Sequence, residues 1–345
     1  MRLAGLATAL MVIAATLAGA AHAFETEEER RFPAARPGSE LRVISTADTA
    51  VFTPIILAFQ AENPEIAVTY VTASSRELMK ALYEEGAQFD LAISSAMDLQ
   101  TKLANDGLVR NYSSEATARL PAWARWRNRI FAFTQEPAVL VLSKSAFADL
   151  PVPTTREELI RLLRDNPERF YGRIGTYDVR RSGLGYLFAT QDSRNTESYW
   201  RLTEIMGRLG ARLYCCSSDM IADVSSGRLA LAYNVLGSYA EAQLHENENI
   251  LIVEPGDYLN VMLRTALIPT TARNTEAAGR MIDFLLSLGT RPELTRKTGL
   301  PPVDPSAFDR NNAFRPIRLG PGLLVFLDRM RRETFLRSWV SSIEQ

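Results

Sequence analysis

Small polar and charged side chains recur where a predicted strand gives way to a predicted helix. Five such junctions contribute these residues: Ser45, Thr46, Asp48 and Thr49; Ser74 and Ser75; Ser94 and Ser95; Arg180, Arg181, Ser182 and Gly183; Asn234, Ser238 and Tyr239. The start of a helix presents unpaired backbone N–H groups and a partial positive charge, which suits an anionic group. In an open parallel sheet, the loops at the carboxyl ends of the strands form the ligand site. We therefore predict that these residues bind a small anionic solute.

Each junction alone is ordinary, because Ser, Thr and Asp are common helix N-caps. Five together, three before residue 100 and two after residue 180, favour a cleft shared by two lobes. The pair Arg180-Arg181 adds guanidinium groups to a helix start. We expect one of the two to form a surface ion pair and the other to face the cleft, and the sequence does not distinguish them.

Residues suited to catalysis are scarce. Of the two histidines, His22 lies in the predicted export signal and His245 lies in a polar stretch, where a solvated position at a helix end is expected. No Gly-x-Ser-x-Gly elbow, Walker loop or complete Gly-x-Gly-x-x-Gly motif is present. We predict a binding protein and not an enzyme, with no catalytic residue, no metal ligand and no cofactor.

Cys215 and Cys216 are the only cysteines, and they are adjacent. In an oxidising compartment they could pair as a strained vicinal disulfide or bridge two chains. The alternative interpretation is two small, half-buried residues at the end of a strand. A metal site is not expected, because no His or further Cys lies nearby to complete it.

Residues 1–23 have the features of a secretory signal: a charged start at Arg2, an uncharged apolar run and the motif Ala21-His22-Ala23. We predict cleavage after Ala23, a periplasmic location and no membrane insertion of the remaining chain. Residues 24–39 are polar and contain Pro and Gly, so they are predicted to be a disordered leader. The 39 Lys and Arg balance 40 Asp and Glu, which argues against nucleic acid as a partner. We expect a monomer.

Short apolar strands alternate with amphipathic helices along the chain. The first examples are the strands 41–44, 66–71 and 91–93, each followed by a helix. This alternation predicts the α/β class, with two doubly wound lobes of mostly parallel sheet. Two apolar strands near 129–142 and a pair at 250–268 are interpreted as crossings between the lobes. The prediction is therefore a first lobe of residues 40–135 and 256–345, which includes helices 276–287 and 323–343, and a second lobe of residues 136–255 joined by a two-strand hinge.

The chain resembles the bacterial extracellular solute-binding proteins of family 1, the periplasmic components of ABC transporters. The resemblance is carried by residues 41–61 (LRVISTADTAVFTPIILAFQA), Asn63-Pro64, 89–95 (FDLAISS), 224–227 (VSSG) and 231–239 (LAYNVLGSY). It implies the type II periplasmic-binding fold, whose lobes close over a ligand. It also implies delivery of that ligand to an inner-membrane ABC permease, or its presentation to a membrane sensor kinase.

Within this family, the chain is similar to the ferric-ion branch and to its phosphoglycerate-regulatory relatives. The ferric branch has adjacent tyrosines after the strand that corresponds to residues 229–233, whereas residues 234–239 here contain Tyr239 alone. Hard Fe(III) requires oxygen ligands that one tyrosine does not supply. The ferric reading remains an alternative, and a phosphorylated or carboxylated organic solute is the favoured ligand.

Overall fold

A mixed sheet, and not the mostly parallel one that was predicted, forms the core of the first lobe. In the computed structural model, which describes residues 24–244 and 247–345, its parallel strands are β2 (Ser39–Ser45), β3 (Ile66–Thr72) and β4 (Leu91–Ser94). Strand β2 lies between the other two, and Val43 pairs with Tyr70 on one side and Leu91 on the other. The strands are almost continuously apolar because helices cover both faces of the sheet. The predicted export signal and His245 lie outside the described residues.

Strand β1 (Glu28–Phe32) corrects the prediction of a disordered leader over residues 24–39. It pairs antiparallel with β3, from Glu28 opposite Thr72 to Phe32 opposite Val68. Only Phe32 of this strand is buried, because a charged strand can form a sheet edge with its side chains in water. The backbone of β3 needs hydrogen-bond partners on that side, and β1 supplies them. The polar composition therefore concealed an ordered edge strand.

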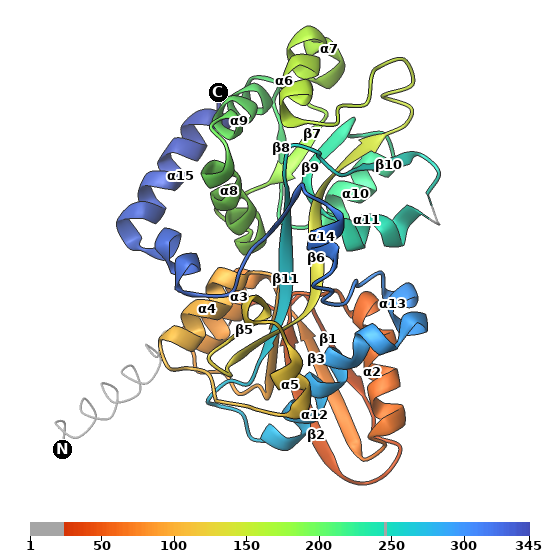
Figure 1. Cartoon of the computed structure of the whole chain (residues 1–345), viewed down its shortest axis with the longest axis vertical. Helices are drawn as coiled ribbons and strands as arrows, with labels where there is room; N and C mark the ends of the chain where they lie inside the picture. Colours follow the sequence, from red (N-terminus) through yellow and green to blue (C-terminus); the bar gives the residue numbers. More distant parts are fainter. Residues whose placement is uncertain (1–23, 245–246) are drawn as a thin grey trace, which may run out of the picture.

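The sheet of the second lobe continues from the first through one long strand. Strand β6 (Ile130–Ser143) pairs with β11 (Leu259–Leu267) in the first lobe and with β9 (Leu231–Leu236) and β10 (Ile250–Val253) in the second. Strand β7 (Ile174–Tyr177) lies parallel to β9 and to β8 (Arg212–Tyr214). The short strands β5 (Arg125–Trp126) and β12 (Phe314–Pro316) pair with β6 and β11. The prediction of two strands near 129–142 is thus replaced by a single crossing strand, as Figure 1 shows.

Helices cover the sheets of both lobes (Figure 1). The first lobe carries α2 (Thr49–Glu62), α3 (Ser75–Met79) with the π-helix η1 (Lys80–Glu84), α4 (Met97–Asn105), α5 (Glu115–Arg119), η2 (Ala122–Ala124), α12 (Thr275–Leu286), η3 (Ser287–Thr290), α13 (Pro292–Thr298) and α14 (Ala307–Arg310). The second carries α6 (Arg156–Asp165), α7 (Pro167–Phe170), α8 (Gly183–Asn195), α9 (Ser198–Arg208), α10 (Ser217–Ser225) and α11 (Gly237–Leu244). Among the described residues, no helix has the length and apolar character needed to span a bilayer.

The C-terminal helix α15 (Arg329–Ile343) packs on the second lobe, which corrects its predicted place on the first. Its buried residues Phe335, Trp339 and Ile343 are spaced four apart and join the core that contains Tyr199 of α9. The chain reaches this position through η4 (Pro321–Leu327), which contacts α4 of the first lobe. The chain therefore crosses between the lobes a third time, beyond the two predicted strands.

Candidate ligand site between the lobes

A narrow cavity of about 70 Å³ lies between the two lobes. Its lining comes from the loops that follow β2, β3 and β4 in the first lobe and β7, β8 and β9 in the second, together with Glu27. Since one water needs about 10–15 Å³ of such space, the cavity as it stands accepts a slender group and not a bulky one. Two wider spaces, of about 660 and 740 Å³, share lining residues with it.

Hydroxyl groups of the first lobe form one wall of the cavity. Thr46 and Ser95 come from neighbouring loops, and the backbone N–H of Ser95 donates to Oγ1 of Thr46 at 3.2 Å. Ser74 is the N-cap of α3, where its Oγ accepts from the N–H of Glu77 at 3.2 Å. These side chains have partners in their own lobe, so they are held in fixed orientations toward the cavity.

The second lobe supplies two helix N-termini to the opposite wall. Ser182 caps α8 and accepts from the N–H of Gly185 at 3.1 Å. Cys216 occupies the N-cap position of α10 without a side-chain bond to the helix. Ser217 follows it, and its Oγ lies 2.5 Å from Oη of Tyr177 and accepts from the N–H of Leu236 at 3.2 Å. The start of α10 is therefore fixed to β7 and β9.

The lobes touch each other at two hydrogen bonds beside the cavity. The N–H of Gly183, at the start of α8, donates to Oγ of Ser75 at 2.9 Å. The N–H of Asp48 donates to Oη of Tyr239 at 3.3 Å. Residues from both lobes also share one apolar cluster that includes Ile44 and Leu187. The structure thus represents an arrangement in which the lobes are in contact across the site.

Two carboxylates face the same cavity. Burial raises the pKa of Asp48, with Arg264 acting in the opposite direction and Asp219 reinforcing the rise. The pKa of Glu27 is raised first by desolvation and then by the negative charges of Asp48 and Asp219. Glu27 precedes β1, where its backbone N–H bonds to Thr72 at 2.8 Å. The negative charges of these acidic residues therefore repel one another. A ligand that carries hydrogen-bond donors would reduce this repulsion.

Eight of the predicted residues line the cavity. These are Thr46, Asp48, Ser74, Ser75, Ser95, Arg181, Ser182 and Tyr239. The two arginines separate as expected: Arg181 lines the cavity, whereas Arg180 forms ion pairs with Asp178 at 2.9 Å and Glu344 at 2.5 Å. The guanidinium of Arg181 makes no hydrogen bond or ion pair with any residue that the structure describes.

The other predicted residues have structural partners instead. Ser45 and Ser94 accept backbone N–H groups two residues ahead, and Thr49 bonds to Thr72 at 3.0 Å. Asn234 is a buried residue of β9 with a φ of 62°, and Ser238 donates to Glu136. These five, with Gly183 and Arg180, do not line the narrow cavity; Ser238 lines the space of about 660 Å³, and Arg180 and Gly183 line that of about 740 Å³. Their role in ligand binding stays a prediction.

Sequence reasoning missed several lining residues: Glu27, Ala73, Tyr177, Leu184, Ser217, Ser218 and Leu236. Ser217 and Ser218 follow strand β8 and open α10, the same strand-to-helix pattern used for the other junctions. That pattern could have identified them. Nothing in the sequence distinguishes Glu27 from the other acidic residues of its segment.

Cys215 and Cys216 form a vicinal disulfide in the cavity wall. Their sulfur atoms and the carboxylate of Asp219 all lie within 4.8 Å of one another, a grouping that could hold a metal ion. Because the two sulfurs are bonded to each other, they offer no thiolate to a metal. Burial also raises the pKa of Tyr239 to about 12, so this phenol is protonated at neutral pH in the metal-free protein.

A buried ion pair joins the two strands that cross behind the cavity. Glu136 of β6 accepts from Nε and Nη2 of Arg264 of β11, at 2.9 and 3.1 Å. Thr134 and Ser238 donate to the same carboxylate. Breaking such a pair leaves an isolated buried charge, at a cost of about 3–5 kcal/mol. The pair therefore fixes the register of β6 and β11 and positions α11, which begins beside Tyr239.

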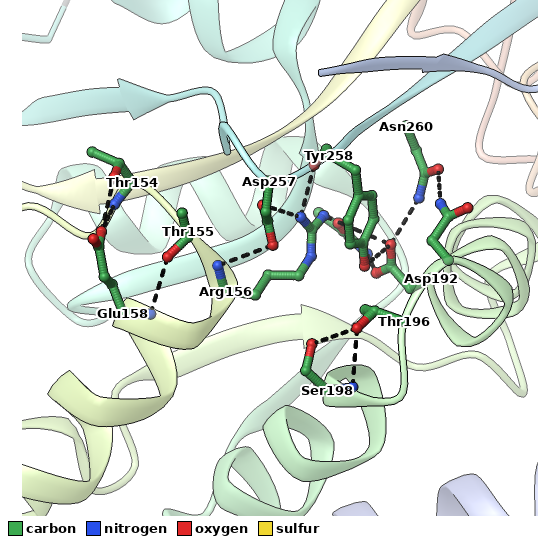
Figure 2. Close-up of polar contacts among 12 residues, drawn as sticks. Thr154, Thr155, Arg156, Glu158, Asp192, Thr196, Ser198, Asp257, Tyr258 and Asn260 are labelled. Atoms are coloured by element: carbon green, nitrogen blue, oxygen red, sulfur yellow. Dashed lines mark hydrogen bonds and ion pairs between the residues drawn. The ribbon is translucent and has the colours of Figure 1, made fainter. Parts of the chain in front are cut away.

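A second buried network fixes α6 and α8 to the start of β11 (Figure 2). Arg156, the first residue of α6, donates to Tyr233 at 2.7 Å, to Asp257 at 2.9 Å and to the carbonyl of Tyr258 at 2.7 Å. Its guanidinium also lies 3.7 Å from the carboxylate of Asp192 in α8. The network makes the second lobe one rigid unit.

Asp192 is the acceptor at the centre of this network. Four side chains donate to its carboxylate at 2.7–3.0 Å, and they are Tyr233, Asn234, Tyr258 and Asn260. A buried carboxylate is tolerated when its oxygens are paired in this way. Because Asp192 belongs to α8, the network holds in place the helix whose N-terminus reaches the cavity.

Comparisons with known proteins agree with this architecture. A family model described as "Bacterial extracellular solute-binding protein" matches residues 41–300. The crystal structure of the substrate binding protein of an ABC transporter from Agrobacterium tumefaciens is 36% identical, with a TM-score of 0.87, over 92% of this chain and 98% of that one. No curated protein matches the sequence.

More distant structures share the fold alone. The periplasmic binding protein AfuA from Actinobacillus pleuropneumoniae, with fructose-6-phosphate bound, is 14% identical, with a TM-score of 0.71 over 89% of this chain and 99% of that one. Iron-bound HitA from Pseudomonas aeruginosa is 18% identical, with a TM-score of 0.67 over 89% and 99%. These likenesses confirm the expected type II periplasmic-binding fold. The chain belongs to the bacterial extracellular solute-binding protein family.

Proposed function

We propose that this chain is the periplasmic substrate-binding protein of an ABC transporter, exported by residues 1–23, and that it carries a small organic anion to a membrane permease. The observation that carries the proposal is the position of Arg181. Its guanidinium lines the cavity without a partner among the described residues, and it directly precedes the N-cap of α8. An unpaired guanidinium beside a helix N-terminus favours a bound anion.

The cavity supports an organic anion over ferric ion. Tyr177 and Tyr239 are the tyrosines that line it, and burial raises the pKa of each phenol. The hydroxyl groups of Thr46, Ser75 and Ser95 suit the oxygens of a phosphate, phosphonate or carboxylate group. The proposal assigns the protein no chemistry on its ligand, since its role is capture and release.

Binding assays with paired arginine variants test this function. Calorimetry and thermal shift with sugar phosphates, phosphonates and carboxylates should identify an anion that stabilises the wild-type protein. Arg181→Gln should then weaken binding about tenfold or more, equivalent to about 1.4 kcal/mol. Arg180→Gln is the matched control, because Arg180 lines the same wider space but not the narrow cavity, and its guanidinium is already paired with Asp178 and Glu344. Stabilisation by ferric ion but by none of the anions would contradict the proposal, as would equal losses in both variants.

A further inference from the structure

The inter-lobe cavity shares lining residues with two wider spaces of opposite charge. On one side it shares Asp48, Ser218 and Tyr239 with a space of about 660 Å³ that also contains Asp219. On the other side it shares Arg181 and Ser182 with a space of about 740 Å³. The two wider spaces therefore adjoin the narrow cavity, which we call the waist. We call the first space the acidic mouth, with Asp48 and Asp219 and with Glu27 in the adjoining wall of the waist, and the second the basic mouth, with Arg181.

Among the residues that the structure describes, no Lys or Arg lines the acidic mouth. Glu27, Asp48 and Asp219 are close enough for their charges to act on one another. The cation that acts on Asp48 is Arg264, which is fully buried and already paired with Glu136. A positively charged ligand group in this mouth would reduce the mutual repulsion of the carboxylates.

The basic mouth has a different balance of charged side chains. Its cations include Arg76, Arg181 and Arg332, and its acidic side chains are Glu77, Glu84 and the buried Asp98. Burial raises the pKa of Asp98 to about 7, so this carboxyl is about half ionised at neutral pH and mostly protonated below it. Arg181 remains as the unpaired cation nearest the waist.

The helices that begin near the two mouths differ in whether an acidic residue lies at their N-terminus. Helix α2 has Asp48 as its N-cap residue, and α10 has Asp219 in its first turn. Their positive ends are therefore already compensated by carboxylates. Helix α8 has no acidic residue in its first turn and is preceded by Arg181. Of these three, α8 is the helix start without a carboxylate to compensate its positive end; the N–H groups of Gly183 and Gly185 bond to Ser75 and Ser182.

We propose that the ligand is a zwitterion, with an ammonium group in the acidic mouth and a phosphonate, phosphate or carboxylate group at Arg181 and the start of α8. The waist of about 70 Å³ then encloses a short, unbranched chain between the two charged ends. A hydroxyl group would donate a hydrogen bond to the carboxylates but would leave their mutual repulsion uncompensated. An ammonium group donates hydrogen bonds and also compensates the negative charge. This inference rests on the proposed function, because it keeps the anionic group and adds a cationic one.

Matched ligand pairs test the inference without any mutation. Calorimetry would compare 2-aminoethylphosphonate with ethylphosphonate, and 4-aminobutyrate with butyrate, with 3-phosphoglycerate as a hydroxylated anion. We expect at least one zwitterion to bind tenfold or more tightly than its partner without the amino group. If the deaminated or hydroxylated anions bind as tightly, the inference is wrong and the proposed function stands. If ferric ion or a diamine binds and no anion does, the inference and the proposed function are both wrong. If no zwitterion in the panel binds, the inference alone is overturned.

Variants locate the ammonium group. Glu27→Gln and Asp48→Asn should each weaken the zwitterion about tenfold and leave binding of the deaminated anion unchanged. Glu29→Gln is the matched control, because Glu29 lies on the same strand as an exposed residue outside the cavity lining. Asp48 makes no side-chain cap bond to α2, and Glu27 is exposed, so neither change is expected to disturb folding. Equal losses for the zwitterion and the deaminated anion would overturn the assignment.

Discussion

Asp98 is a buried carboxyl group in the first turn of α4, with a side-chain oxygen that has no partner among the described residues. Burial raises its pKa to about 7, against an unfolded value of about 3.9, and Arg332 only partly opposes this rise. The folded state therefore holds a proton that the unfolded state releases. Its contribution to stability is present below about pH 4 and is lost as the pH rises through 7.

Asp98→Asn should remove this penalty. At pH 8 the variant should unfold at a higher urea concentration than the wild type. Its free energy of unfolding should be larger by up to a few kcal/mol, since one pKa unit corresponds to about 1.4 kcal/mol. At pH 4 the two proteins should be nearly equal. Asp106→Asn on the same segment is the control, because Lys102 lowers the pKa of Asp106 and its effect has the opposite sign. A difference between wild type and Asp98→Asn that is the same at pH 4 and pH 8 would contradict the prediction.

Individual site residues show where sequence reasoning ends. The strand-to-helix pattern predicted Thr46, Ser74, Ser95 and Ser182 correctly as cavity-lining residues, because that pattern is local. Arg180 is held by Asp178, two residues before it, and by Glu344, which lies 164 residues away in sequence. Asp178 could have indicated Arg180 as the paired arginine, whereas no local rule contains Glu344.

The start of α8 is held against the start of α3 by close packing at Gly183. A Cβ atom at this position would lie 2.6 Å from Oγ of Ser75 and 3.1 Å from Cδ1 of Leu99, both in the other lobe. Gly183→Ala should therefore force the lobes apart and weaken ligand binding about tenfold, or about 1.4 kcal/mol. Small-angle scattering should show a larger radius of gyration for the variant.

Two further variants give this prediction its controls. Gly322→Ala adds the same atom where no other atom lies within 4 Å, so it should leave both measurements unchanged. The double variant Ser75→Gly with Gly183→Ala removes the obstructing side chain and should recover part of the affinity. If the double variant binds no better than Gly183→Ala, the clash with Ser75 is not the cause.

Elements were predictable where an apolar pattern is continuous and less so at the edges. Strands β3 and β4 were found because they are buried throughout, and β2 was found from its apolar residues Leu41, Val43 and Ile44. Strand β1 was missed because the charged side chains of this edge strand are exposed to solvent, so its sequence has no apolar pattern. The place of α15 was also missed: its stripe of Phe335, Trp339 and Ile343 predicts a helix but not the surface that it covers.

Helix α15 connects the end of the chain to the second lobe, and three crossings now join the lobes. Trp339 is 2% exposed, and its ring belongs to the core with Tyr199 and Leu202 of α9. The cluster that includes Ile44 and Leu187 continues from one lobe into the other. Loss of packing in the second lobe should therefore reach the first, and the two should unfold in one transition.

Trp339→Ala tests this coupling. The substitution removes a buried aromatic ring, which costs about 3–5 kcal/mol, whereas Met330→Ala on the same helix removes a side chain that is 76% exposed and should cost little. In a Trp200→Phe background, the fluorescence of the Trp339→Ala variant comes from Trp123 and Trp126 of the first lobe, because these are the tryptophans that remain. Urea unfolding followed by this fluorescence and by circular dichroism should give coincident curves, both shifted to lower urea. A fluorescence curve that keeps the wild-type midpoint while the dichroism curve shifts would show that the lobes unfold separately, because the packing of α15 would then stabilise only the lobe that it covers.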